Sequence, residues 1–571
     1  MGQFINSMFL YPNDTPDKKE RLLFVTKDEN GNKKHKFIKE PKFSFYVTKD
    51  EYRGHGPLSY IEKDKVQRVV TKRKDVNSTI ANYLSNANIK AEYERIMKSG
   101  NKDEYKKLRD IHLDPEIHGS DVNIEDYFIG QYIKKQEEKE GADNSAKLHK
   151  VFFDIEVDPV GYVQGFPDPE EALAPINVIS ASDLTYNKVY VFALRYDTDT
   201  YRDAMSRQEE LIGELKDKYK AKGLDLEFII HEYDTELEVI WNFLDLINNK
   251  LKPDFCVGFN LSFDFGTIYN RIIRLGEDPN EYFSPKDFEF KKAYYKLDTR
   301  SNDIADKSDV FQTTSYTNWV DLLSLYANIN KPNGRLESYS LDFIGKLEVG
   351  EEKDDFDGSI VDLHYRDYYK FLLYNIQDTV MTMMIEDKIK FIDLLYMITV
   401  MTRTRISKAL KKTVCLRNFA EKFYDEQGYV ISNNRARQQD ANTEKIKGGF
   451  VGDPNNIDKV GIQLIKDIDD RSDKIFENVA DFDLASLYPS IIEAFNISPE
   501  TFIGKINYII DKGDEKIDLT PEFIDDYNSN DGANFSIKYY NLPDLDKASD
   551  ELIDIIDKQI TKEEYLNGVL D

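Results

Sequence analysis

The 571 residues of this chain are too many for one hydrophobic core, so the usual domain size predicts three or four domains. Apolar residues make up 40% and charged residues 32% of the chain, and this balance argues against general disorder. A net charge of −28 argues against a protein that coats nucleic acid without sequence preference, because phosphate binding requires clustered Lys and Arg.

The sequence lacks signals for membrane insertion, export and soft-metal binding. No stretch of about eighteen consecutive apolar residues occurs, and residues 1–14 lack the features of a signal peptide, so we expect a cytoplasmic protein without membrane contact. Cys256 and Cys415 show no Cys-x-x-Cys spacing, and we expect both to be buried rather than paired. Because the seven histidines show no metal-binding spacing, any metal should be a hard cation held by oxygen, such as Mg²⁺.

The first 147 residues mix strand-like runs with charged helical segments. We expect strands at 43–47 and 66–70, a helical stretch near 90–110, and a Lys/Glu-rich end at 134–140. No residue pattern in this part indicates chemistry.

From residue 148 strands and helices alternate, which is typical of an α/β domain with a mixed sheet. We expect strands at 151–157, 189–194, 228–230 and 255–259, with a helix capped by Asp234 before the last of these. Long helical patterns follow at 365–388 and past Met401. Beyond Gly448 and Gly449 the chain returns to strands and ends in an acidic region, 511–571.

Residues 401–420 hold six basic residues and no acidic one. These residues could line a duplex backbone, or they could form the solvated face of a helix, which is the more common meaning of such a run. They are Arg403, Arg405, Lys408, Lys411, Lys412 and Arg417.

Two acids lie two residues apart in a predicted strand. Asp154 and Glu156 in VFFDIEV point to the same face, which suits two ligands of one cation. The alternative is an ordinary half-exposed strand whose apolar residues, Phe153 and Ile155 among them, face the core while the acids face water.

Two further acids, Asp264 and Asp378, lie at positions where a metal ligand could be placed. Asp264 follows a strand end and begins a helix, where a helix cap is the alternative interpretation. Tyr374 and Asp378 share one face of an apolar helix, where an acid is costly unless it is paired or binds a metal. Four converging carboxylates repel one another, so bound cations would be needed; Tyr374 could then hold the attacking water of a phosphodiester hydrolysis.

These motifs resemble those of a known family. FDIEV, Asn-x-x-Phe-Asp at 260–264 and Tyr-x-x-x-Asp at 374–378 are similar to the three exonuclease motifs of the B-family DNA polymerases, in the same order. DFDLASLYPSII resembles the first polymerase motif of that family. Smaller matches favour the replicative polymerases of tailed phages, and they include FPDP from Phe166 and NISPE from Asn496. The resemblance covers about residues 148–510.

The resemblance implies a mixed α+β, multi-domain chain: an N-terminal domain (1–147), a ribonuclease-H-like 3′–5′ exonuclease domain (148–390), a helical connection (391–445) and a partial polymerase palm (446–571). It implies that two Mg²⁺ ions, replaceable by Mn²⁺, are bound in the exonuclease site by Asp154, Glu156, Asp264 and Asp378. It also implies that DNA is contacted by Asn260, Phe263, Gly448 and Gly449.

For the polymerase site, the resemblance implies that Asp483 binds the catalytic metals together with the Leu484 carbonyl. The incoming nucleotide would be surrounded by Ser486, Leu487 and Tyr488, and Tyr488 would exclude a 2′-hydroxyl. Asp481 could be mistaken for the ligand, but the spacing to Ser486 favours Asp483.

Two further motifs of the family, a fingers helix with Lys-x-x-x-Asn-Ser-x-Tyr-Gly and a hairpin with Tyr-Gly-Asp-Thr-Asp-Ser, do not occur in these residues. The nearest string, Tyr196 to Asp199, lacks the glycine and is interpreted as a surface turn. We therefore expect DNA synthesis only with a partner chain that supplies the missing parts, unless the sequence is a truncated copy.

The sequence thus predicts one subunit of a split, proofreading DNA polymerase in a phage-infected bacterium, acting on primer-template DNA, single-stranded DNA and dNTP, with a sliding clamp left open as a further partner. One alternative is a stand-alone exonuclease with an inert polymerase remnant, and a second is a non-enzymatic scaffold for primer-template. The four carboxylates argue against the scaffold, and the intact Ser-Leu-Tyr-Pro-Ser argues against the remnant.

Overall fold

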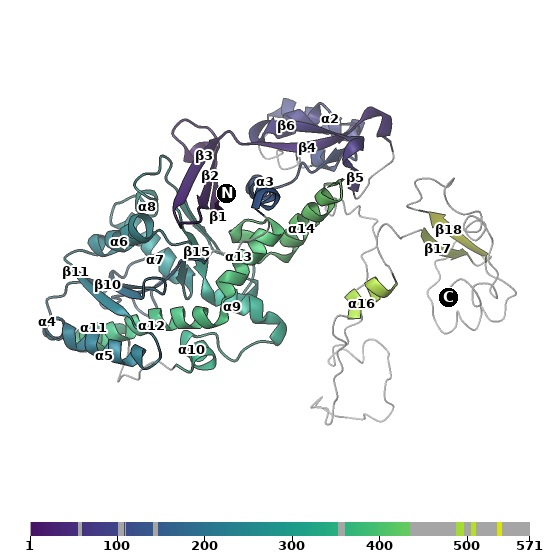
Figure 1. The fold of residues 1–571 in the computed structure, drawn as a ribbon. Coiled ribbons are helices and arrows are strands. Elements are labelled where there is room, and N and C mark those ends of the chain that lie inside the picture. Colours follow the sequence, from purple (N-terminus) through teal and green to yellow (C-terminus); the bar gives the residue numbers. More distant parts are fainter. Residues whose placement is uncertain are drawn as a thin grey trace, which may run out of the picture. The chain divides into compact units, whose positions relative to one another are not determined.

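The computed structural model describes residues 2–54, 60–100, 108, 110–140, 147–351, 360–433, 487–495, 504–509 and 534–539. The chain divides into two compact units, residues 1–438 and 439–571 (Figure 1). No helix in the described ranges is long and apolar enough to cross a membrane.

The N-terminal part of the first unit holds two small sheets. One is antiparallel, in the order β1 (Gln3–Leu10), β2 (Arg21–Lys27) and β3 (Lys33–Lys39). The other has the order β6 (Val66–Lys72), β4 (Lys42–Thr48) and β7 (Ile117–His118), which confirms the strands expected at 43–47 and 66–70. The helices of this part are α1 (Val76–Ala81), α2 (Ala87–Ser99) and α3 (Ile124–Glu140).

A six-stranded mixed sheet forms the centre of the first unit. Its order is β11 (Glu227–Tyr233), β10 (Lys188–Leu194), β9 (Ile176–Asp183), β8 (Lys150–Val157), β12 (Phe255–Gly258) and β15 (Asn318–Asp321). Strand β8 is antiparallel to β9 and parallel to β12. The mixed sheet predicted from residue 148 is therefore present. Strand β9 was missed, although all eight of its residues are buried.

Helices cover both faces of this sheet (Figure 1). On one face, Val151, Phe153 and Ile155 of β8 belong to a core shared with α6 (Glu236–Asp245) and α7 (Leu261–Arg274). On the other face, Phe152 packs in a core with α4 (Asp199–Ser206), α5 (Gln208–Lys220), α9 (Leu322–Asn330), α10 (Leu341–Val349) and α12 (Tyr368–Ile389). The acids of β8, which alternate with Phe153 and Ile155, therefore lie on the face that α12 covers, where both are half-buried.

The remaining elements of this unit surround the sheet or lead away from it. They are α8 (Pro279–Tyr282), the hairpin of β13 (Ala293–Lys296) and β14 (Val310–Thr313), α11 (Leu363–Arg366), α13 (Phe391–Thr402), α14 (Lys412–Glu426), and β16 (Tyr429–Ile431), which pairs with β5 (Tyr60–Glu62). The second unit contains α16 (Leu487–Ala494) and the antiparallel pair β17 (Gly504–Ile509) and β18 (Asn534–Tyr539).

Two local predictions were wrong in detail. Thr235, not Asp234, caps α6, because the Thr235 hydroxyl accepts the Glu238 N–H in a capping box while Asp234 pairs with Arg195. The helical pattern at 365–388 is broken at Asp367, whose side chain caps α12.

The basic stretch at 401–420 is not one helix face, because α13 ends at Thr402 and α14 begins at Lys412. Three of its cations are engaged by acids of the N-terminal part: Arg403 pairs with Glu137, Arg405 with Asp126 and Arg417 with Asp121. These pairs hold α13 and α14 against the region of α3, and they leave fewer charges for a DNA backbone than the sequence suggested.

Candidate active site

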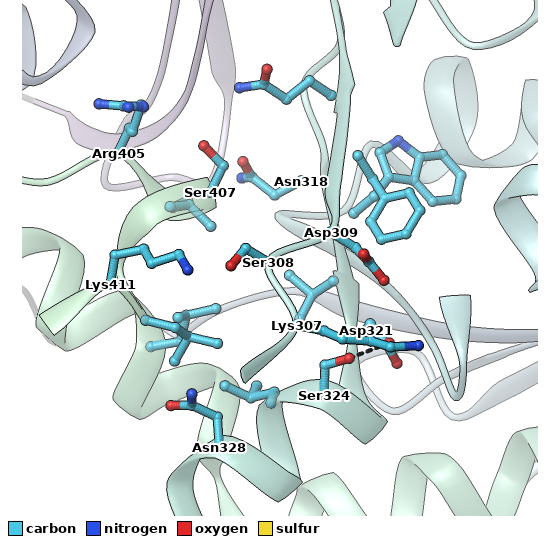
Figure 2. Close-up of a pocket in the computed structure, with 18 of the residues that line it drawn as sticks. Lys307, Ser308, Asp309, Asn318, Asp321, Ser324, Asn328, Arg405, Ser407 and Lys411 are labelled. Atoms are coloured by element: carbon cyan, nitrogen blue, oxygen red, sulfur yellow. Dashed lines mark hydrogen bonds between the residues drawn. The ribbon is translucent and has the colours of Figure 1, made fainter. Parts of the chain in front are cut away.

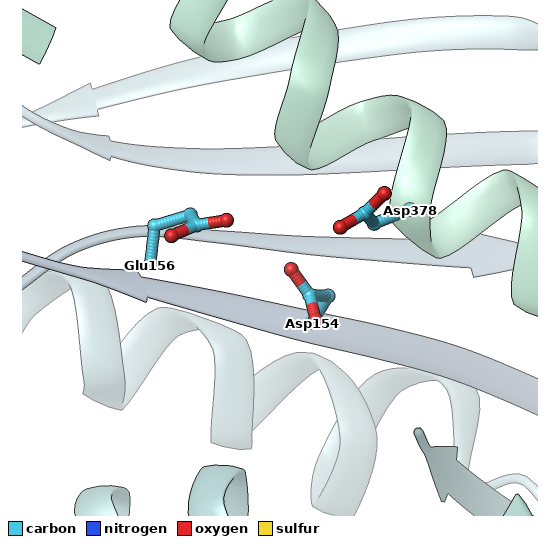
Figure 3. Close-up of side chains that lie close together, drawn as sticks. All are labelled: Asp154, Glu156 and Asp378. Carbon is cyan, nitrogen blue, oxygen red and sulfur yellow. The ribbon is translucent and has the colours of Figure 1, made fainter. Parts of the chain in front are cut away.

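Three carboxylates converge between the central sheet and α12. Asp154, Glu156 and Asp378 each offer an oxygen within 4.8 Å of the others (Figure 3). The two-residue period of β8 places Asp154 and Glu156 on one face, and the packing of α12 on that face brings Asp378 above them. The structure thus joins two motifs that lie more than two hundred residues apart in sequence.

Buried and partly buried hydrogen bonds fix the position of α12 on β8 and β9. The Asn375 amide donates to Oδ2 of Asp154 at 3.0 Å, and the Ser182 hydroxyl of β9 donates to the Thr379 carbonyl at 3.1 Å. Near the far end of α12, Nζ of Lys150 lies 2.9 Å from Oε1 of Glu386. Asn375 was not predicted, although its place one helical turn before Asp378 could have indicated it.

Asp264 lies in the first turn of α7 and is buried beside this cluster. Burial, followed by the negative charges of Asp154, Asp321 and Glu156, raises the pKa of Asp264 well above its usual value. Its Oδ2 atom accepts no hydrogen bond. The residue at 258 is glycine, and a Cβ there would lie 3.1 Å from this oxygen, so a larger residue would crowd it.

Asp321 at the end of β15 is a further acid that sequence reasoning missed. Its carboxylate accepts the backbone N–H of Asn260 and of Leu323, both at 3.0 Å, and the Ser324 hydroxyl at 2.7 Å. Burial raises the pKa of Asp321 as well. Asp321 therefore joins the start of α7 to the end of β15, and its position directly before an apolar helical run was the available signal.

The predicted DNA contacts lie at the start of α7. Asn260 precedes the helix in the left-handed region with φ 70°, its side chain is exposed, and its Oδ1 accepts the Ser262 hydroxyl. Phe263 is half-buried, and its ring centroid lies 5.3 Å from that of Phe166, which is 82% exposed. Tyr374 is half-buried on α12, one turn before Asp378.

The polymerase residues are only partly described. Asp483, Leu484, Ser486, Gly448 and Gly449 lie outside the described residues. Leu487 and Tyr488 begin α16, and the Tyr488 side chain is 73% exposed. The surface turn predicted from Tyr196 is confirmed only in part: Asp197 and Asp199 are almost fully exposed, but Tyr196 is half-buried and Asp199 already begins α4, which Thr198 caps.

The acidic cluster fits a hard divalent cation. All of its donors are carboxylate oxygens, which Mg²⁺ and Mn²⁺ prefer. The buried Oδ2 of Asp264, which has no hydrogen bond, is an oxygen that a cation would satisfy. Divalent-metal use is therefore consistent with the residues present.

Comparison with known proteins agrees with this geometry. Residues 110–344 match the model of the exonuclease domain of DNA polymerase family B. This part of the chain is therefore similar to the exonuclease domain of family B DNA polymerases. That match includes Asp154, Glu156 and Asp264 but ends before Tyr374 and Asp378, and the fold brings Asp378 to the other acids.

The polymerases of two phages resemble more of the chain than the exonuclease domain. The DNA-directed DNA polymerase of Escherichia phage RB69 is 26% identical over 446 residues, which are 75% of this chain and 44% of that protein. The DNA-directed DNA polymerase of Enterobacteria phage T4 is 27% identical over 356 residues, 60% of this chain and 35% of that protein. The chain therefore spans less than half the length of these relatives.

Proposed function

We propose that this chain hydrolyses DNA from the 3′ end as the proofreading part of a viral DNA polymerase. The observation that carries the proposal is the convergence of Asp154, Glu156 and Asp378, with the buried Asp264 beside them. Four acids gathered in this way are unfavourable for a purely structural role, because like charges repel and burial disfavours the charged form.

These four acids would hold two Mg²⁺ ions. When bound, the ions would activate a water molecule and stabilise the leaving 3′ oxygen. Tyr374, on the same helix face as Asp378, would orient that water through its hydroxyl. Asn375 would keep the Asp154 carboxylate in place by its 3.0 Å hydrogen bond.

The end of the DNA strand would lie over the start of α7. Asn260 offers an exposed amide, and the neighbouring rings of Phe166 and Phe263 offer surfaces on which an unpaired base can stack. Single-stranded DNA is the favoured substrate, because bases must be unstacked to reach such rings.

A 3′-labelled oligonucleotide tests this proposal directly. Asp154→Ala combined with Glu156→Ala should abolish digestion in Mg²⁺ or Mn²⁺. The matched control is Asp197→Ala with Asp199→Ala, which removes two exposed acids at the same spacing and should leave digestion unchanged. Full digestion by the first double variant would contradict the proposal. Tyr374→Phe should slow digestion less than Asp264→Ala, because Tyr374 holds water and no metal.

We further propose that DNA synthesis requires Asp483 together with the fingers and the second aspartate of the family, which these 571 residues do not contain. A second polypeptide with those motifs would supply them, and a sliding clamp is a further partner to test. Mixing the chains should restore synthesis, and Asp483→Ala should abolish it. The stand-alone exonuclease would be favoured instead if the mixture synthesised DNA equally well with Asp483→Ala.

A further inference from the structure

The buried carboxylate of Asp158, the residue directly after β8, contacts three side chains. Asp158 follows β8 and lies two residues beyond Glu156, and it is 3% exposed. Its Oδ2 accepts the Tyr365 hydroxyl at 2.7 Å and the Tyr196 hydroxyl at 3.3 Å. Its Oδ1 accepts the Val160 N–H at 3.0 Å and lies 3.2 Å from Nε2 of His364. The backbone N–H of Asp158 donates to the Pro175 carbonyl, so the backbone here is also held.

The partners of Asp158 come from the segment that leads into the other half of the site. His364 and Tyr365 belong to α11, which directly precedes α12, the helix of Tyr374 and Asp378 (Figure 1). The His364 ring is 1% exposed and lies among the rings of Tyr365, Tyr196 and Phe371, with centroids 4.2, 5.5 and 5.5 Å away. Nε2 of His364 makes no hydrogen bond within the described residues, so its contact with Oδ1 of Asp158 is a close polar approach at a place from which these rings exclude water.

Polar contacts therefore join β8 and the residue that follows it to α12 and to α11, which directly precedes α12, at three points. Lys150 with Glu386 lies at one end, Asp154 with Asn375 in the middle, and Asp158 with His364 and Tyr365 at the other end. The first contact is made by Lys150, four residues before Asp154, and the second by Asp154 itself. The contact at Asp158 is the one nearest to Glu156 in sequence. Directly after Glu156, the pairing of β8 with β9 shifts register, between Glu156 and Val157. At this irregular end of β8, the side-chain contacts of Asp158 add to the backbone hydrogen bond from Asp158 to Pro175.

We propose that Asp158, His364 and Tyr365 are positioning residues that hold Glu156 and Asp378 at the separation at which they share a cation. The inference rests on the proposed function, because it takes the acidic cluster to be a divalent-metal site. Residues behind metal ligands commonly act in this way, and their replacement costs about 10- to 100-fold in metal affinity or activity.

Mn²⁺ binding to the full chain without DNA, measured by isothermal titration calorimetry, tests the inference apart from catalysis. His364→Phe keeps a ring of similar size but loses Nε2, and it should weaken Mn²⁺ binding about tenfold or more. Tyr365→Phe removes one hydroxyl and should weaken it by a smaller factor. Tyr186→Phe, an exposed tyrosine in the turn between β9 and β10, is the matched control and should bind Mn²⁺ like the unchanged chain. Digestion of single-stranded DNA by both variants should recover at high Mn²⁺ concentration, since the ligands themselves remain.

The outcomes separate this inference from the proposed function. Unchanged Mn²⁺ affinity in both His364→Phe and Tyr365→Phe, even with a lower melting temperature, would overturn the positioning role and leave the proposed function standing. Mn²⁺ binding that weakens in the variants, in a chain that digests no DNA, would support the positioning role and overturn the proposed function. A chain that binds no Mn²⁺ at all would overturn both.

Discussion

Asp264 shows how a residue can be unfavourable for folding and useful for function. Its carboxyl is buried beside other acids, and its pKa is raised well above the usual value by that burial and by their charges. A cation that binds the folded chain alone stabilises it by mass action, by about 2.7 kcal/mol at a concentration one hundred times the dissociation constant.

We therefore predict that millimolar Mn²⁺ raises the melting temperature of the unchanged chain and has a smaller effect on Asp264→Asn. Without metal, the variant should melt at the same temperature or higher, because an amide replaces a carboxyl that charge repulsion disfavours. A thermal melt with and without Mn²⁺ measures both effects. An equal Mn²⁺ shift in the two proteins would contradict a ligand role for Asp264.

Glu125 is a second buried acid, far in sequence from the site, and it gives a pH-dependent prediction. Burial is the largest cause that raises its pKa from 4.5 to about 7. Because the folded-state pKa is raised, the stability contributed by the protonated Glu125 carboxyl is fully present below pH 4.5 and is lost as the pH rises through 7. At 1.36 kcal/mol for each pKa unit, the loss amounts to about 3 kcal/mol.

The test compares urea unfolding of the unchanged chain with that of Glu125→Gln at several pH values. The variant should gain stability relative to the unchanged chain between pH 4.5 and 7, because glutamine has no charge to bury. A stability difference that stays constant across this range would show that the Glu125 pKa is not raised.

At the scale of elements, the packing of α10 on α12 depends on one glycine. A Cβ at Gly345 of α10 would overlap the Met381 sulfur and would lie 3.2 Å from the Glu351 carbonyl oxygen. Gly345→Ala should therefore push α10 away from α12 and cost about 1 to 3 kcal/mol. Since α12 carries Asp378, digestion of DNA should slow as well.

Gly213 of α5 provides a control with the same substitution in another helix. A Cβ there meets nothing within 4 Å, and alanine is favoured over glycine inside a helix by up to about 1 kcal/mol. Gly213→Ala should therefore raise the melting temperature while Gly345→Ala lowers it. Changes of the same sign in both variants would show that the contact with Met381 does not decide the outcome.

At the scale of the whole molecule, the acids of the candidate exonuclease site lie in one unit. Asp154, Glu156, Asp264 and Asp378 all lie in residues 1–438, whereas Asp483 lies in residues 439–571. We predict that a chain of residues 1–438 digests single-stranded DNA at a rate close to that of the full chain. Gel analysis of a labelled oligonucleotide measures this, with the Asp154→Ala and Glu156→Ala double variant of the short chain as the blank. A large loss of activity would mean that residues 439–571 contribute to the site.

The sequence by itself determined the chemistry of the candidate site and much of the central sheet. The two-residue spacing of Asp154 and Glu156 fixes their common strand face, and the four-residue spacing of Tyr374 and Asp378 fixes their common helix face. Strands β8, β10 and β11 and the turn after β10 follow from local pattern as well, because alternation and capping residues act over a few positions. The domain boundaries inside residues 1–438 and the polymerase roles of Asp483 and its neighbours stay predictions.

Only the tertiary structure decided which residues meet. It placed α12 over β8, so that Asp378 reaches Asp154 and Glu156, and it added Asn375, Asp321 and the surroundings of Asp158, which the sequence analysis did not single out. It also paired three of the six basic residues after Met401 with acids in or near α3. The physical reason is that a local sequence pattern shows only the period of one helix or strand. The pairing of charges and the burial of acids depend on which face of that helix or strand is covered by another element.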